Sequence, residues 1–214
     1  MTPEQQTAVD RLNAYASLME EIKYRHAAIQ LVLDGRTGLP HLVAHELGYL
    51  QLRYTCELIA LGCLVAHGDI PAVQSKRLRK AWAADEIINT LDWLHPDFFP
   101  HAVKQVALPA DQVPDGSKNA YDLPRLSDGF LTKDELVTLY HECGTVLHRG
   151  SLDKLHLRPQ RHADTEKLRE YLARIVALLN HHTIQPIDPQ YLYIIMMKTD
   201  STGNVQANLF AKIS

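Results

Sequence analysis

Residues 131–150, LTKDELVTLYHECGTVLHRG, decide the fold. Thr132, followed three residues later by Glu135, is typical of a capping box and predicts that a helix begins there. Apolar side chains then recur at helical spacing and predict one buried stripe, made of Leu136, Leu139, Tyr140, Cys143 and Leu147. The helix is expected to end at His148, Arg149 and Gly150, because basic residues suit the negative end of a helix dipole and Gly suits the C-cap. A chemical site, if the protein has one, is expected beside that end.

Similar apolar periodicity occurs elsewhere in the chain and predicts about five helices in total. They are expected at residues 3–34, 41–66, 69–94, 132–150 and 165–180. The second of them is apolar on more than one side, which is typical of a central helix. His181 and His182 are expected to end the last helix. The sequence therefore predicts a mainly α protein, an up-and-down helical bundle.

The C-terminal part of the chain has a different pattern. Residues 191–197 are continuously apolar, residues 205–213 alternate between apolar and polar, and a turn-forming stretch separates them. This pattern predicts a small C-terminal β-hairpin. A lone hairpin is not stable in water, so it is expected to pack on the bundle, to pair with a strand at 103–108, or to pair with another chain.

The expected organisation is a helical bundle domain at residues 1–182 and a β-hairpin appendage at 183–214. Helical patterning stops between residues 96 and 130, where prolines recur. One strand is predicted inside this Pro-rich loop, at residues 103–108. A loop of this length is expected to pack on the domain or to close a site, because long loops without structure or function are uncommon.

The composition of the 214-residue chain is that of a globular protein, with 46% hydrophobic and 22% charged residues. A net charge of −3 excludes a basic field over the whole chain, so a DNA partner is not expected. The densest basic run, KRLRK at residues 76–80, suits either a solvated helix face or a phosphate-binding surface. Three sparse cysteines, a polar N-terminus and the absence of a long apolar run predict a cytoplasmic protein with no membrane partner.

Histidine spacing offers one candidate metal site. His41 and His45 form H-x-x-x-H on one helical turn, a spacing that can hold zinc, although no third ligand is evident. The alternative is a pair of surface histidines near a helix N-terminus. A metal-dependent hydrolase using these residues is a third hypothesis for function. No Gly-rich phosphate loop, G-x-S-x-G or C-x-x-C occurs, so no cofactor is expected.

A second candidate site combines Arg53 and Glu57 of the central helix with Tyr140, His148 and Arg149. These side chains converge if the two helices pack antiparallel. Histidine can move a proton near neutral pH, and arginine can hold a phosphate with two hydrogen bonds. This chemistry suits metal-independent RNA cleavage, in which a base activates the ribose 2′-hydroxyl and a cation stabilises the pentavalent phosphate. The alternative is a buried ion pair beside a helix-capping histidine.

Residues 52–69, LRYTCELIALGCLVAHGD, followed later by LYHECGTVLHRG at 139–150, resemble the HEPN superfamily. The likeness is narrower to bacterial HEPN-like families of unknown function, with an R-x-x-x-E helix and a late helix ending in an aliphatic residue plus His. It covers about residues 15–180 and leaves the C-terminal hairpin out. No Arg precedes His148 at the spacing of the family's R-x(4–6)-H motif, whereas Arg149 and His156 fit R-x(6)-H.

The resemblance implies a small helical bundle that often dimerises. Active members are RNases of toxin and antiphage systems, with the motif at the dimer cleft, and other members are not catalytic. The leading hypothesis is therefore a homodimer that binds or cleaves RNA without metal, using Arg149, His148 and His156, supported by Arg53, Glu57 and Tyr140. The alternative is a non-catalytic dimeric interaction module, in which the hairpin and the Pro-rich loop form the partner surface.

Overall fold

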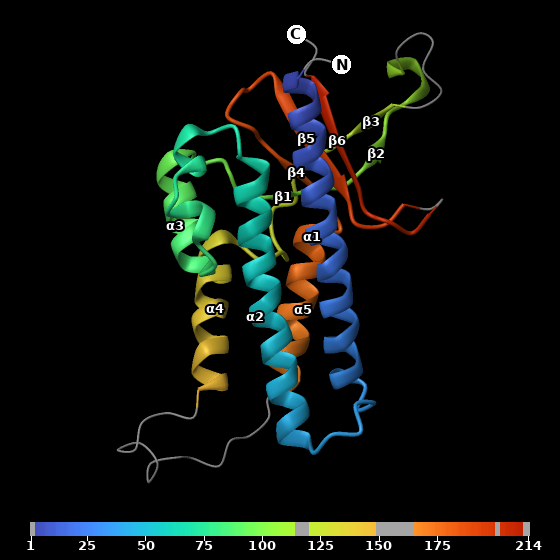
Figure 1. Cartoon of the computed structure of the whole chain (residues 1–214). Helices are drawn as coiled ribbons and strands as arrows, with labels where there is room; N and C mark the ends of the chain where they lie inside the picture. Colours follow the sequence, from blue (N-terminus) through green and yellow to red (C-terminus); the bar gives the residue numbers. More distant parts are fainter. Residues whose placement is uncertain (1–2, 114–119, 149–164, 200–201, 212–214) are drawn as a thin grey trace.

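The structure is a computed structural model that describes residues 3–113, 120–148, 165–199 and 202–211. Its α-helices in these ranges are α1 (Pro3–Leu33), α2 (His41–Ala66), α3 (Ala84–Leu94), α4 (Lys133–Leu147) and α5 (Thr165–Leu179). Helices α1, α2, α4 and α5 run side by side as a bundle, and α3 lies beside α2 and α4 (Figure 1). The predicted mainly α architecture is confirmed. No described helix has both the length and the apolar character needed to cross a membrane.

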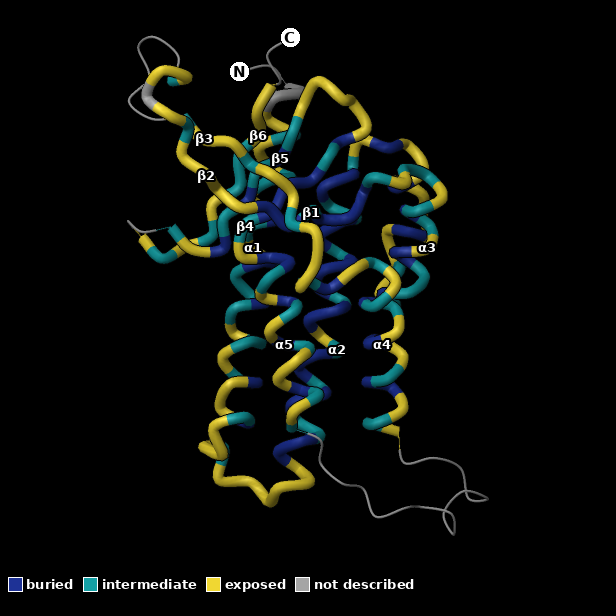
Figure 2. The backbone as a smooth tube through the Cα atoms, turned by 180° about the vertical axis from the view of Figure 1, so that it is seen from behind, coloured by how far each residue is buried: buried dark blue, intermediate teal, exposed yellow. Residues whose placement is uncertain are grey.

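Helix α2 is the centre of the bundle, as its sequence predicts. It contacts α1, α3, α4 and α5. Its buried residues lie on more than one face: Leu52, Cys56, Ile59 and Cys63 form one stripe, and Leu58 and Ala60 are buried on either side of it. Figure 2 shows the same arrangement, with buried positions on the inward sides of the helices. All three cysteines are buried free thiols and fill the core as small apolar side chains.

Helix α4 begins as its sequence predicts. Thr132 is the N-cap, its hydroxyl accepts from the backbone of Glu135, and the Glu135 carboxylate accepts from the backbone of Thr132. Arg174 of α5 donates to the same carboxylate. This hydrogen bond is the main reason why the pKa of Glu135 falls to about 2. The contact between Arg174 and Glu135 holds the start of α4 against α5. The helix ends at Leu147.

Two glycines let neighbouring helices approach α2 closely. A Cβ atom on Gly48 would lie 2.6 Å from Cδ2 of Leu168, which is buried on α5. A Cβ atom on Gly62 would lie 3.0 Å from Cε2 of Tyr15 on α1. Glycine at these positions therefore sets the spacing of three helices.

Replacing Gly48 by Ala is expected to lower the free energy of unfolding by about 1–3 kcal/mol, the usual cost of overpacking a close contact. Urea unfolding followed by circular dichroism measures the change. In a Leu168→Ala background the added methyl finds space, so the Gly48→Ala cost should nearly vanish. Additive costs in the double variant would contradict this account.

The stretch from 69 to 94 is not one helix, and that prediction is wrong. It contains two short 3-10 helices, η1 (Pro71–Gln74) and η2 (Leu78–Lys80), before α3 begins at Ala84. Extended residues at Ser75, Ala81 and Ala83 separate these pieces. An α-helix through residues 76–80 would stack four cations at i,i+3 and i,i+4 spacing, which is unfavourable.

A four-stranded antiparallel sheet stands at the end of the bundle where α1 begins (Figure 1). In sheet order its strands are β1 (His101–Ala102), β4 (His181–Ile184), β5 (Tyr191–Met196) and β6 (Gln206–Ala211). The β5–β6 hairpin has the predicted pattern, and Tyr193 and Ile195 are its buried positions facing the bundle. The hairpin is not an isolated appendage, however. His181 and His182 form the start of β4 rather than the end of a helix.

The described residues of the Pro-rich loop pair with the C-terminal sheet, through β1, and with each other. The predicted range 103–108 contains the short strand β2 (Val106–Ala107), which pairs with β3 (Tyr121–Asp122) and not with the C-terminal hairpin. Strand β1 precedes this range and pairs with β4. The β2–β3 arm projects away from the bundle (Figure 1). A partner later in the same loop costs less closure entropy than a remote one. The division into a domain at 1–182 and an appendage at 183–214 stays a prediction, and β4 lies across that boundary.

Candidate functional site

Arg53 is held in the seam between α2 and α4. Its Nε lies 3.3 Å from Oε1 of Glu57, one helical turn further along α2. Its Nη2 donates to the Tyr140 hydroxyl at 2.7 Å, and its Cζ lies 4.2 Å from the centroid of the Tyr140 ring. The side chains of Arg53 and Glu57 are only 22% and 20% exposed. The structure thus brings together the three supporting residues of the predicted site.

Helix α4 supplies the other wall of this site. Tyr140, Gly144 and His148 follow one another at intervals of four residues, so they share one face of the helix. A Cβ atom on Gly144 would lie 3.2 Å from Nη1 of Arg53 and 4.0 Å from Cδ2 of His148. The guanidinium of Arg53 and the ring of His148 therefore both lie close to Gly144, and a methyl group at this position would crowd the guanidinium. His148 is the exposed C-cap residue of α4.

The first turn of α3 closes the site from a third side. The backbone N–H of Ala84 donates a hydrogen bond to the Tyr140 hydroxyl. Asp85 lies 3.4 Å from Nε2 of His141, the residue after Tyr140. The Tyr140 oxygen consequently accepts hydrogen bonds from both Arg53 and the start of α3. These contacts fix its position relative to α2.

The electrostatics of the site favour proton exchange at Glu57 rather than at Tyr140. Burial raises the pKa of Glu57, and the attraction of Arg53 only partly opposes this effect. Burial likewise raises the pKa of Tyr140, so the phenol stays protonated at neutral pH. The site therefore combines a fixed cation, a neutral phenol and a carboxyl group that accepts a proton more readily than usual.

Two of the predicted catalytic residues, Arg149 and His156, lie outside the described residues. The structure does not place them beside or away from Arg53. The roles of all six predicted site residues stay predictions.

The candidate metal ligands differ from each other in environment. His41 is exposed, whereas His45 is 7% exposed and its ring centroid lies 4.9 Å from that of Tyr49. Within the part of the chain that the structure describes, no group of three His, Cys, Asp or Glu side chains could hold a metal ion. A zinc site built on these two histidines has no third ligand there.

A second polar cluster lies on α4, and the sequence does not predict it. Oε1 of Glu142 lies 2.6 Å from Nζ of Lys167 and accepts from the Tyr49 hydroxyl at 3.3 Å. Its Oε2 accepts from the Tyr171 hydroxyl at 2.9 Å. Burial is the largest cause that raises the pKa of Tyr171, followed by its bond to Glu142. Tyr171 lies in a helix that is predicted from apolar periodicity, which carries no signal for this polar contact.

Buried histidines form another feature that the spacing of residues does not show. His182 is wholly buried, its Nδ1 lies 2.7 Å from the Leu179 carbonyl, and its Nε2 lies 2.7 Å from the Tyr15 hydroxyl. The ring therefore donates through Nδ1 and accepts through Nε2 as a neutral imidazole. Its position joins α1 to β4 and α5, and marks it as a structural group rather than a site residue.

The fold and its site define a helical bundle with a sheet-capped end and a polar seam between α2 and α4. Comparison of the chain with protein-family models, with curated proteins and with solved structures found no match. The site therefore has to be interpreted from its own chemistry.

Proposed function

We propose that the protein binds and cleaves RNA without a metal ion, at the seam of Arg53, Tyr140 and His148. The observation that supports this proposal is that Nη1 of Arg53 and the His148 ring both lie beside Gly144. A guanidinium binds the non-bridging oxygens of a phosphodiester through directed N–H donors. An imidazole beside it is the usual group for proton transfer near neutral pH.

In the proposed reaction His148 takes the proton from a ribose 2′-hydroxyl. The 2′-oxygen then attacks phosphorus, the bond to the 5′-oxygen breaks, and a 2′,3′-cyclic phosphate forms. Arg53 stabilises the extra negative charge on the pentavalent phosphate. A protonated group returns one proton to the leaving 5′-oxygen, and Glu57, with its raised pKa, is the nearby candidate.

Incubating the protein with a mixed RNA pool in EDTA is expected to give products with 2′,3′-cyclic phosphate ends. His148→Ala should lower the cleavage rate by about 100-fold, because general acid–base groups contribute at least that much. His141→Ala is the matched control, since His141 lies on the same helix but not on the face that Tyr140, Gly144 and His148 share. Equal rates in wild type and His148→Ala would refute the assigned role.

The second candidate function is a non-catalytic dimeric interaction module. Strand β6 favours it, because β6 ends the sheet and, within the described residues, pairs only with β5. Leu209 and Phe210 on this strand are 39% and 48% exposed. An edge strand of this kind is a template for pairing with a second chain. Light scattering of wild type and of Leu209→Lys tests it, and a monomer in both would exclude a β6-mediated dimer.

A further inference from the structure

The segment before α3 carries a run of positive charge between Asp69 on one side and Asp85 and Glu86 on the other. Residues 70–84 contain Lys76, Arg77, Arg79 and Lys80 and no Asp or Glu. All four cations are exposed, whereas the side chains of Val73 and Leu78 in the same segment are buried in the core. The whole chain has a net charge of −3, so this cluster is a local exception.

Only one of these cations has an acidic partner in the described part of the chain. Nε of Arg77 lies 3.0 Å from Oε1 of Glu86, and its Nη2 donates to the Thr90 hydroxyl at 3.3 Å. Lys76, Arg79 and Lys80 have no ion pair with any described residue. Three cations on one short segment repel one another, and a bound anion would remove that repulsion.

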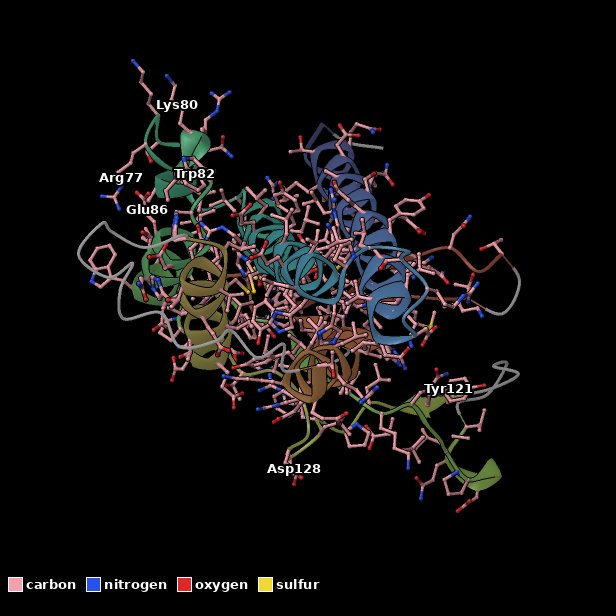
Figure 3. The ribbon with its side chains drawn as sticks, turned by 90° about the horizontal axis from the view of Figure 1, so that it is seen from below. Arg77, Lys80, Trp82, Glu86, Tyr121 and Asp128 are labelled. Carbon is pink, nitrogen blue, oxygen red and sulfur yellow. The ribbon has the colours of Figure 1, made fainter. Side chains whose placement is uncertain are left out.

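An exposed tryptophan lies directly beside these cations. Trp82 follows Lys80 by two residues and is 65% exposed. Figure 3 shows Arg77 and Lys80 projecting outward from the segment that carries Trp82, with Glu86 beside Arg77. An indole offers a flat face on which a nucleobase can stack, and neighbouring cations can hold the phosphates on either side.

We propose that Lys76, Arg79, Lys80 and Trp82 form a docking surface for single-stranded RNA. This inference rests on the proposed function, because it supplies the site with its substrate. Trp82 is two residues before Ala84, whose N–H bonds to the Tyr140 hydroxyl of the candidate site. A strand stacked on Trp82 therefore lies next to the third wall of the Arg53 site. Duplex RNA hides its base faces, so the surface selects single strands.

Binding is measured by fluorescence anisotropy with a labelled 2′-O-methyl RNA of about 15 nucleotides. This probe has no free 2′-hydroxyl to attack phosphorus, so binding is read separately from cleavage. Trp82→Ala should weaken binding at least fivefold, since one stacked base contributes about 1–3 kcal/mol. Trp93→Ala is the matched control, because Trp93 lies on α3 with 83% exposure and outside the basic run.

The charge contribution is tested by salt dependence. Lys76→Ala with Lys80→Ala should make the slope of log affinity against log salt shallower by about 1.4, the value for two phosphate contacts on a single strand. Arg36→Ala with Lys104→Ala removes two exposed cations elsewhere and should leave the slope unchanged.

The outcomes separate the two proposals. Equal affinities of wild type, Trp82→Ala and the lysine double variant would overturn the docking surface, even if cleavage persists. Binding that depends on Trp82 and the lysines would support it, even if no RNA is cut. Binding of duplex RNA as tight as that of the single strand would overturn its proposed selectivity.

Discussion

Lowering the pH from about 7 to about 4 is expected to remove about 3 kcal/mol of folding free energy through His182 alone. Burial is the main reason why the pKa of His182 falls to about 4. The neutral ring already uses both nitrogens, donating to the Leu179 carbonyl and accepting from the Tyr15 hydroxyl. A second proton would leave the Tyr15 hydroxyl without its acceptor and a charge inside the core.

The direction of this stability change follows from comparing how many protons the folded and the unfolded chain bind. Unfolded histidine has a pKa near 6.5, so between about pH 6.5 and 4 the unfolded chain binds more protons than the folded one. Stability therefore falls as pH falls through that window. Burial lowers the pKa of His26 to about 4 as well, and it lowers the pKa of His67. Both histidines therefore add to the loss of folding stability as the pH falls. Glu135, with its pKa near 2, acts mainly below this window.

Urea unfolding at a series of pH values tests this prediction. His182→Gln should be less stable than wild type at neutral pH but should show a shallower loss between about pH 6.5 and 4. The solvent-exposed His41→Gln is the matched control and should follow the wild-type curve. If His182→Gln keeps the full wild-type slope, the acid sensitivity does not come from the His182–Tyr15 contact.

Local signals in the sequence predict much of the helical part of this fold. The capping box of Thr132 and Glu135 involves residues three apart, so it fixes the start of α4 without tertiary information. The predicted bounds of the second helix, residues 41–66, likewise agree with α2 (His41–Ala66). The sheet is different, because β1 pairs with β4 across about eighty residues of sequence. Two-residue strands such as β1 have no periodicity to detect.

Some contacts of the candidate site can likewise be predicted from the sequence, and others cannot. Arg53 and Glu57 are one turn apart, and antiparallel packing of two apolar stripes is enough to bring Tyr140 to them. The hydrogen bond of Ala84 to Tyr140 depended on where η2 ends and α3 begins, which the sequence did not show. The contact of Tyr15 with His182 joins residues 167 positions apart, and each looked like an ordinary helix residue or helix end.

Replacing Arg53 by Ala is expected to lower RNA cleavage by roughly 100- to 1,000-fold, the usual cost of losing one donor to a transition-state oxyanion. The same change removes the partner of Glu57 and the donor to Tyr140, so stability should fall too. Arg53→Lys keeps the positive charge but cannot donate to Glu57 and Tyr140 from one rigid plane. It should retain most of the stability and still lose most of the activity.

A combined replacement separates a catalytic role from a structural one. Arg53→Met with Glu57→Leu removes both charges of the seam together, and such replacements of partly buried ion pairs are often neutral or stabilising. Tyr140 keeps the hydrogen bond from Ala84 in this variant. We expect a folded protein, within about 1 kcal/mol of wild type, with no detectable cleavage.

This expectation follows from the free energy that is lost when the charged groups of the seam are removed from water. Apolar side chains between α2 and α4 would stabilise the bundle as well as the charged set does, so stability alone gives no reason for Arg53 and Glu57 to lie there. A charged group held at a helix seam beside an exposed histidine is instead typical of a functional site. If the double variant is folded and still cleaves RNA like the wild type, the Arg53 seam is structural, and the reacting groups lie elsewhere in the chain.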